Sequence, residues 1–217
     1  MTNDALRPSV LGVKLIPNVD DKMAEELNLP AGYKSIGIVT ADCDDVTYTA
    51  LDQATKMAEV TVVYGKSFYG GAANANTKLA GEVIGIIAGP TPAEVKSGLN
   101  AIVDFIENEA SFYSANEDDT IAYYAHCVSR TGSYLSKTAG IEEGEALAYL
   151  IAPPIEAMYA LDAALKAADV KLTAFFGPPS ETNFGGGLLT GSQSACKAAC
   201  EAFADAVKFV AQNPTKY

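Results

Sequence analysis

Four acidic residues are the side chains of this sequence best suited to chemistry. Asp44 and Asp45 follow the short apolar run 36–41. Glu82 lies at the start of the later apolar stretch 81–88, and Glu156 stands 111 residues after Asp45. Carboxylates that gather in one place can hold a small primary ammonium group through charge-assisted hydrogen bonds. Because the chain repeats itself at a similar offset, we expect Asp45 and Glu156 to face each other between the repeats, with Phe112 and Tyr113 as walls of the site.

Two other interpretations of these carboxylates remain open. Asp44 and Asp45 stand just before Val46 at a predicted helix start, where aspartate is favoured as a cap and by the helix dipole. Alternatively, Asp45, Glu82 and Glu156 are the acid–base groups of an enzyme. Paired carboxylates are typical of glycosidases, but the chain has no Trp that could form a sugar-binding platform. We therefore predict no catalytic residues.

Two glycine-rich stretches, residues 66–77 and 177–187, are long enough to be functional loops. Glycine reaches positive φ freely, so glycine pairs ease rearrangement of the backbone. In one interpretation the loops form a gate in which an aromatic ring or an amide is the plug and the glycines are hinges. The alternative is a pair of plain surface hairpins. Neither stretch reads GxxxxGK[ST], which disfavours a phosphate loop. The candidate gate residues are Tyr69, Gly70, Gly71, Asn183, Phe184 and Gly185.

The single histidine and the four cysteines do not suggest a metal site or a nucleophile. His126 lies in an apolar stretch, where we expect it to pack, and no second histidine exists to complete a site. No CxxC occurs, so the cysteines are predicted to be reduced core residues. The turn at residues 129–133 is a candidate anion site, or else Arg130 bridges subunits. The cysteines are Cys43, Cys127, Cys196 and Cys200.

The composition limits the class of protein. The chain has 217 residues, of which 49% are apolar, so two domains of ordinary size with real cores are expected. A net charge of −12 argues against nucleic-acid binding and is compatible with attraction of small cations. No apolar run is long enough to span a bilayer, and the first ten residues do not resemble a signal peptide. We expect a soluble, cytoplasmic protein.

An internal repeat organises the whole chain. The pattern A-L-D-x-A-x-K-x-A-[ED]-V occurs at residues 50–60 and again at 160–170, an offset of 110. Upstream, the apolar run 36–41 matches 147–152 at an offset of 111, and downstream 89–93 matches 191–195 at an offset of 102. Three blocks in the same order make chance a poor explanation, so the chain consists of two similar units.

Hydrophobic periodicity predicts the same elements in both units. We predict an α+β fold in which each unit is a four-stranded antiparallel sheet with helices packed on it. The domains are expected at residues 1–110 and 111–217, with a polar, acidic boundary near 108–119. The predicted strands are 10–16, 35–40, 60–64, 81–88, 121–129, 147–152, 170–175 and 188–190, and the predicted helices include 20–27, 47–58, 92–107, a turn near 134 and 194–211.

The order of these blocks resembles the bacterial microcompartment shell (BMC) domain family, in a circularly permuted, tandem form. Lys56 and Lys166 match a lysine that lies, in that family, at the edge between neighbouring tiles. The chain is similar to ethanolamine-utilization shell proteins over nearly its full length. The matching segments are 40–48 (TADCDDVTY), 128–135 (VSRTGSYL), 178–183 (PPSETN) and 189–193 (LTGSQ).

The resemblance implies a non-enzymatic shell subunit located in a microcompartment. It implies a homotrimer that assembles with other shell proteins in a flat layer, with a central pore closed by the gate loops. It also implies small acidic pores in which Asp44, Asp45, Glu82, Phe112 and Glu156 bind ethanolamine. No cofactor is required, although cobalamin and ethanolamine are expected as transported ligands. The alternative is a small-amine sensor that does not assemble.

Overall fold

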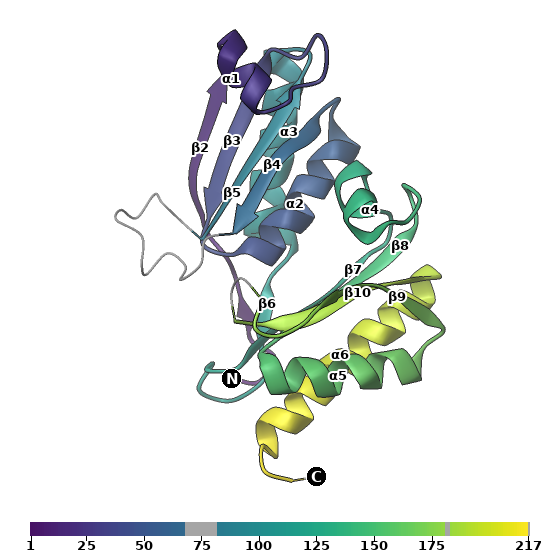
Figure 1. The fold of residues 1–217 in the computed structure, drawn as a ribbon. Helices are drawn as coiled ribbons and strands as arrows, with labels where there is room; N and C mark the ends of the chain where they lie inside the picture. The colour runs from purple at the N-terminus through teal and green to yellow at the C-terminus, as the bar shows by residue number, and fades with distance from the viewer. Residues whose placement is uncertain (68–81, 181–182, 217) are drawn as a thin grey trace. The chain divides into compact units, whose positions relative to one another are not determined.

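A computed structural model of the chain describes residues 1–67, 82–180 and 183–216 (Figure 1). The chain divides into two compact units, which we describe separately. The N-terminal unit comprises Pro8–Ala110 and Gly132–Leu135, and the C-terminal unit comprises Met1–Arg7, Ser111–Thr131 and Ser136–Tyr217. The predicted ranges 1–110 and 111–217 differ from these units in two segments. Met1–Arg7 belongs to the C-terminal unit although the range 1–110 included it, and Gly132–Leu135 belongs to the N-terminal unit although the range 111–217 included it.

The N-terminal unit contains a four-stranded antiparallel sheet of order β2-β3-β5-β4. Helices α2 and α3 cover one face (Figure 1), where Gly37 and Gly85 leave room for the side chains of Leu99 and Leu51. On the other face, Ile36 and Ile86 pack with residues of the short helix α1 and its flanks. The elements are β2 (Val10–Ile16), α1 (Asp21–Glu26), β3 (Ser35–Ala41), α2 (Asp44–Met57), β4 (Thr61–Ser67), β5 (Val83–Gly89), α3 (Pro92–Asp104) and a π-helical turn η2 (Phe105–Glu109).

The C-terminal unit repeats this arrangement with the strand order β7-β8-β10-β9, to which β6 and β1 add two short edge strands. Its sheet therefore has six strands rather than the predicted four. Helices α5 and α6 cover one face (Figure 1), and Leu150, Leu189 and Phe203 lie in the core between them and the sheet. The elements are β1 (Ala5–Leu6), β6 (Phe112–Ser114), β7 (Ala122–Val128), β8 (Ala146–Ala152), α5 (Pro154–Ala167), β9 (Val170–Phe176), β10 (Gly185–Gly191) and α6 (Gln193–Gln212). The first three residues of helix α4 (Ser133–Ala139) belong to the N-terminal unit and the rest to the C-terminal unit.

The sequence predicted most of these elements, but it missed the short edge strands β1 and β6. β2 has the predicted bounds, and the other predicted strands agree within a few residues. Helix α2 begins at Asp44 rather than Thr47, so both aspartates lie inside the helix. The predicted polar boundary near 108–119 contains strand β6, in which Phe112 and Ser114 are buried because β6 pairs with β1 and β7.

Helix caps follow the rules that side-chain chemistry sets. Thr91 precedes α3 and its hydroxyl accepts a hydrogen bond from the Glu94 amide at 3.2 Å, with a proline in the first turn. Ser192 does the same for α6 by accepting from the Ala195 amide at 3.1 Å. These caps stabilise the start of the last helix in each repeat.

Candidate amine site and gate residues

Asp44 and Asp45 occupy the first turn of α2, and both are buried. The residue before the helix, Cys43, makes no side-chain capping hydrogen bond. One Asp44 oxygen accepts from the Asp45 amide at 2.8 Å and the other accepts from the Ser67 hydroxyl at 2.7 Å. The capping alternative is therefore wrong for Asp44 as an N-cap residue, although the helix dipole still favours a carboxylate in this turn.

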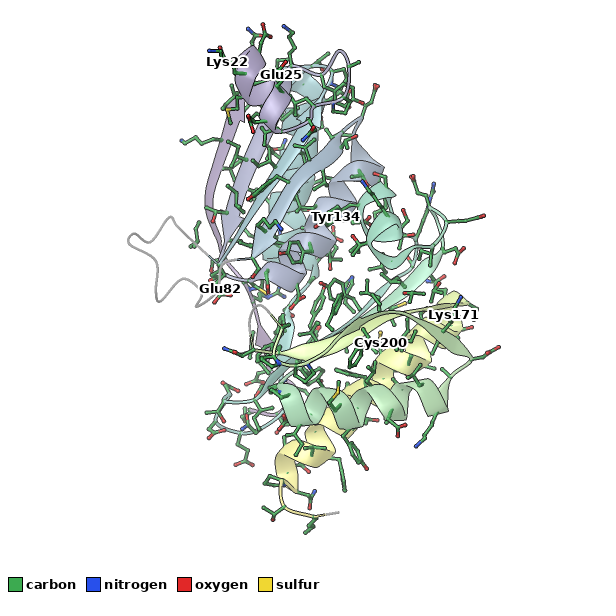
Figure 2. The ribbon with its side chains drawn as sticks, in the orientation of Figure 1. Lys22, Glu25, Glu82, Tyr134, Lys171 and Cys200 are labelled. Carbon is green, nitrogen blue, oxygen red and sulfur yellow. The ribbon has the colours of Figure 1, made fainter. Side chains whose placement is uncertain are left out.

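Glu82 lies at the same end of the N-terminal sheet as the start of α2 (Figure 2). Its amide donates to the carbonyl oxygen of Ala41 at 2.8 Å, which continues the pairing of β5 with β3. The pKa of the Cys43 thiol is raised well above its ordinary value, chiefly by burial and then by the charges of Asp45, Asp44 and Glu82. Three carboxylates thus act on one thiol, so they share one small region, and the thiol stays protonated at neutral pH.

This acidic group can bind a cation but cannot use Cys43 as a nucleophile or a soft metal ligand, because those roles need the thiolate. Among the residues that the structure describes, no set of three or more His, Cys, Asp or Glu side chains is arranged to hold a metal ion. An organic ammonium group needs only hydrogen-bond acceptors that bear negative charge. The arrangement therefore suits a small amine better than a metal.

The other two predicted ligand residues belong to the C-terminal unit. Phe112 is 8% exposed on β6, and its ring stacks on Tyr124 with centroids 5.3 Å apart. Glu156 is 6% exposed in the first turn of α5. Whether these two residues complete the acidic group of the N-terminal unit stays a prediction.

Asp45 and Glu156 are not equivalent positions of the repeat, contrary to the prediction, because they differ by one residue in the helical frame. The strands β3 and β8 start at 35 and 146, an offset of 111, but the helices α2 and α5 start at 44 and 154, an offset of 110. In the helical frame Asp45 therefore corresponds to Ile155, and Glu156 corresponds to Val46. The connection from strand to helix is one residue shorter in the C-terminal unit, and this shifts the repeat alignment.

The gate candidates divide between described residues and residues outside the described ranges. Tyr69, Gly70 and Gly71 lie outside them. Asn183 takes a left-handed conformation with φ of 67°, in a turn where the Ser180 amide donates to the carbonyl oxygen of Phe184 at 2.8 Å. The ring of Phe184 lies 6.1 Å from that of Phe112.

Gly185 is the first residue of β10 rather than part of a loop. The strand begins three residues before the predicted Leu188 because its glycines pair fully with β8, from Gly185 with Ala152 onward. A Cβ at Gly186 would collide with the carbonyl oxygen of Leu150, so the sheet itself requires glycine there. The glycines of this stretch thus serve sheet pairing, and a hinge role for Gly185 stays a prediction.

Sequence reasoning missed the role of Asp52. This side chain is 0% exposed, and its two oxygens accept from the amides of Gly132 and Leu135, each at 2.8 Å. The Lys56 ammonium lies 3.4 Å from the same carboxylate. The turn at residues 129–133 was predicted as a candidate anion site. The anionic group that the Gly132 amide of this turn binds is the carboxylate of Asp52. Asp52 and Asp162 occupy the same position of the repeated motif, so the motif did not indicate that Asp52 is buried while Asp162 is exposed.

His126 and the remaining cysteines are packed, as predicted. The His126 ring stacks on Tyr124 with centroids 5.5 Å apart and an interplanar angle of 1°. Cys196 and Cys200 are buried, Cys43 and Cys127 are partly buried, and all four are free thiols. No helix in the described part of the chain is long and apolar enough to cross a membrane.

Comparison with known proteins identifies the family. Residues 35–117 match the BMC domain family. The chain is 72% identical to the bacterial microcompartment shell protein EutL of Clostridium perfringens over 214 residues, covering 99% of each chain. It is 55% identical to EutL of Salmonella typhimurium, covering 98% of this chain and 97% of that one. The crystal structure of EutL from Leptotrichia buccalis superposes with a TM-score of 0.98 at 79% identity over the full length of both chains.

Two antiparallel α+β units of this kind define a shell protein of bacterial microcompartments. Within that class, the chain belongs to the EutL family. The predicted fold class, the shell role, the microcompartment location and the absence of an enzymatic function are confirmed by this membership. Shell proteins of the family assemble with other shell proteins.

Proposed function

We propose that the chain forms a homotrimer in the shell of an ethanolamine-utilization microcompartment and binds ethanolamine through its acidic group. The observation that carries the ligand proposal is the gathering of Asp44, Asp45 and Glu82 around Cys43 at the start of α2. Ethanolamine has a primary ammonium group, which three carboxylates can hold, and a hydroxyl group that suits an acceptor such as Asp44. The relative from Leptotrichia buccalis is an ethanolamine utilization protein, which supports the same ligand.

Calorimetry on the assembled protein tests the ligand proposal. Asp44→Asn and Asp45→Asn are each expected to weaken ethanolamine binding by roughly 10-fold or more, because losing a charged hydrogen-bond partner costs about 1.5–3 kcal/mol. The matched control is Asp169→Asn, which removes an exposed aspartate of the C-terminal unit and should leave the affinity unchanged. Equal affinities for all three variants and the unchanged protein would place the site elsewhere.

Glu156→Gln tests the part of the proposal that joins the two units. If the Glu156 carboxylate belongs to the ethanolamine site, this isosteric variant also weakens binding by about 10-fold. If only the N-terminal carboxylates bind, Glu156→Gln keeps the original affinity while Asp45→Asn loses it. The two outcomes separate a site built from one unit from a site built from both.

Native mass spectrometry tests the assembly. A homotrimer has three times the chain mass of 22.6 kDa. A stable monomer at micromolar concentration that still binds ethanolamine would contradict the trimer and favour the second candidate, a small-amine sensor that does not assemble. The shell role of the EutL family makes the trimer our first choice.

We further propose that the gate residues control a central pore and that cobalamin is a second transported ligand. Phe184 and Phe112 are ring neighbours, which places one gate candidate beside one ligand-site candidate. Equilibrium dialysis against cobalamin, followed by its visible absorption, tests the second ligand. Cobalamin that distributes equally across the dialysis membrane would contradict binding.

A further inference from the structure

A hollow of about 360 Å³ lies in the C-terminal unit, away from every residue that the acidic group uses. Alternate residues of β7 point toward α6 because side chains alternate along a strand, and residues one turn apart on α6 meet them. Tyr113 and Asn3 complete the lining. From β7 the lining residues are Tyr123, Ala125 and Cys127, and from α6 they are Lys197, Cys200, Glu201 and Ala204.

One wall of the hollow is aromatic. Tyr113 and Tyr123 are cross-strand partners of β6 and β7, and their ring centroids are 6.1 Å apart. Tyr113 is 38% exposed, whereas Tyr123 is 4% exposed. Burial, with the nearby Tyr113 and Asp205, raises the pKa of Tyr123, so its phenol remains a hydrogen-bond donor at neutral pH. Ala125 and Ala204 are small, which leaves room for a flat ligand beside the tyrosine rings.

The opposite side of the hollow offers two charges of opposite sign. Lys197 and Glu201 are four residues apart on α6, so they lie on the same side of the helix. Within the described residues, neither side chain has an ion pair or a hydrogen bond. Other lysines of the same unit do pair along a helix, as Lys166 does with Asp162 at 2.6 Å and Lys208 with Asp205 at 2.8 Å.

Lys197 lies close enough to Cys127 for its charge to act on the thiol. The positive charge of Lys197 lowers the pKa of the Cys127 thiol, while burial raises that pKa by more. Cys200, a buried residue of α6 (Figure 2), is 6% exposed and lines the hollow together with Cys127. The hollow therefore combines two thiols, an aromatic wall, one cation and one anion.

We propose that this hollow binds a small zwitterion with an aromatic body, of which an aromatic α-amino acid is the simplest example. The ligand carboxylate binds the Lys197 ammonium, the ligand ammonium binds the Glu201 carboxylate, and the ring lies against Tyr113. Small-molecule sites of this kind are largely apolar with a few polar groups that fix orientation, and a volume near 360 Å³ falls within their usual range. A simple anion or cation meets one partner and one repelling charge, whereas a zwitterion meets two partners.

Binding of three probes to the full-length assembled protein tests the charge requirement. The probes are L-phenylalanine, 3-phenylpropionate, which lacks the ammonium group, and 2-phenylethylamine, which lacks the carboxylate. We expect phenylalanine to bind at least about 10-fold more tightly than either analogue, because each analogue lacks one charged hydrogen-bonding group. Equal binding of all three, or no binding of phenylalanine at concentrations up to roughly 10 mM, would overturn the proposal.

Two substitutions assign the charges. Lys197→Met should weaken phenylalanine and 3-phenylpropionate without weakening 2-phenylethylamine, and Glu201→Gln should weaken phenylalanine and 2-phenylethylamine without weakening 3-phenylpropionate. Both side chains are exposed, so neither change is expected to unfold the protein. The control is Lys171→Met, an exposed lysine on β9 outside the hollow (Figure 2), which should change nothing. Equal effects of Lys197→Met and Lys171→Met would contradict the assignment.

Alkylation of Cys127 locates the ligand. Peptide mapping follows each thiol separately during reaction with iodoacetamide at pH 9. Phenylalanine at saturation should slow the alkylation of Cys127 by roughly threefold or more, since this thiol lines the hollow. The control is the Lys197→Met variant, in which phenylalanine should slow the alkylation of Cys127 much less because its binding is weakened. An unchanged rate at Cys127 would show that any bound phenylalanine lies elsewhere.

Discussion

Asp52 and Asp162 occupy the same place in the repeated motif but have opposite surroundings. Asp52 is fully buried and accepts two backbone hydrogen bonds, whereas the side chain of Asp162 is 63% exposed and pairs with Lys166. A buried carboxylate is tolerated when its oxygens are satisfied, and its loss leaves buried amides unpaired. The lysines of the motif differ in exposure in the same way: the side chain of Lys56 is 20% exposed, whereas that of Lys166 is 75% exposed.

We predict that Asp52→Asn destabilises the protein by about 2–5 kcal/mol. The amide keeps one acceptor oxygen but turns an NH₂ group toward a backbone N–H, and the ion pair between Lys56 and this carboxylate is lost. The matched control is Asp162→Asn, which should change stability by no more than about 0.5 kcal/mol because exposed ion pairs contribute little. Urea unfolding monitored by circular dichroism measures both. Equal midpoints for the two variants would contradict the role assigned to Asp52.

Tyr134 gives the protein a specific sensitivity to alkali. Burial, together with the negative charge of Asp52, raises the pKa of Tyr134 to about 12. Its ring lies 6.3 Å from that of Tyr48 in the same unit (Figure 2). Since the folded pKa is above the unfolded value, the contribution of Tyr134 to stability is complete below pH 10 and is lost as the pH rises toward 12.

The predicted consequence is a difference in pH dependence. Between pH 10 and 12 the unchanged protein should lose roughly 2–3 kcal/mol of stability through this group, while Tyr134→Phe lacks that loss. Denaturant midpoints measured at intervals across this range test the prediction, and Tyr64→Phe, an exposed tyrosine of the same unit, is the control. Parallel pH profiles for Tyr134→Phe and the unchanged protein would argue against a buried, neutral phenol.

At the scale of elements, the two units differ where strands pass into helices. The connection from β3 to α2 contains two residues and that from β8 to α5 contains one, and β10 likewise reaches α6 one residue sooner than β5 reaches α3. The same helical positions are buried in both units, since Leu51 is 0% exposed and Leu161 is 4% exposed. The first turns of the two helices differ: Asp45 is 7% exposed, whereas Ile155, at the same helical position, is 61% exposed.

The glycines at the start of β10 are required by the sheet. Gly186 has φ of 148°, and a Cβ there would collide with the carbonyl oxygen of Leu150 on β8. We predict that Gly186→Ala costs at least about 2 kcal/mol of stability, through both the backbone conformation and the broken pairing. Gly140→Ala is the control, because Gly140 also has positive φ but nothing lies within 4 Å of its Cβ position.

Gly140→Ala should cost only about 1–2 kcal/mol, the price of the left-handed conformation alone. Thermal unfolding followed by circular dichroism compares the two variants. A melting temperature for Gly186→Ala equal to that of Gly140→Ala would show that β8 and β10 can separate locally without cost. That result would also revive the hinge interpretation of this stretch.

At the scale of the whole molecule, charge affects assembly. Each chain has a net charge of −12, so neighbouring copies repel each other at low ionic strength. Salt screens this repulsion, and the Debye length falls from about 30 Å at 0.01 M to about 10 Å at 0.1 M. We predict that self-association strengthens as sodium chloride rises from about 10 to 200 mM. Sedimentation velocity measures this, and weaker association at higher salt would indicate that attractive ion pairs dominate the interfaces.

The sequence by itself determined the two-unit architecture, nearly every strand and the position of the acidic group. Apolar periodicity depends on which face of an element is buried, and Asp44 and Asp45 stand only three and four residues beyond the end of β3, so local information was sufficient. The family resemblance, carried by matching segments rather than by periodicity, supplied the shell role that the comparisons confirmed.

The tertiary structure alone decided which copy of a repeated residue is buried and which segment completes which unit. Asp52 receives the amides of Gly132 and Leu135 from 80 and 83 residues away, and Met1–Arg7 joins the C-terminal unit through the pairing of β1 with β6. The hollow beside Lys197 and Glu201 likewise depends on β6, β7 and α6 meeting. Long-range contacts leave no trace in local spacing, because two identical motifs acquire different environments only when distant segments pack against one of them.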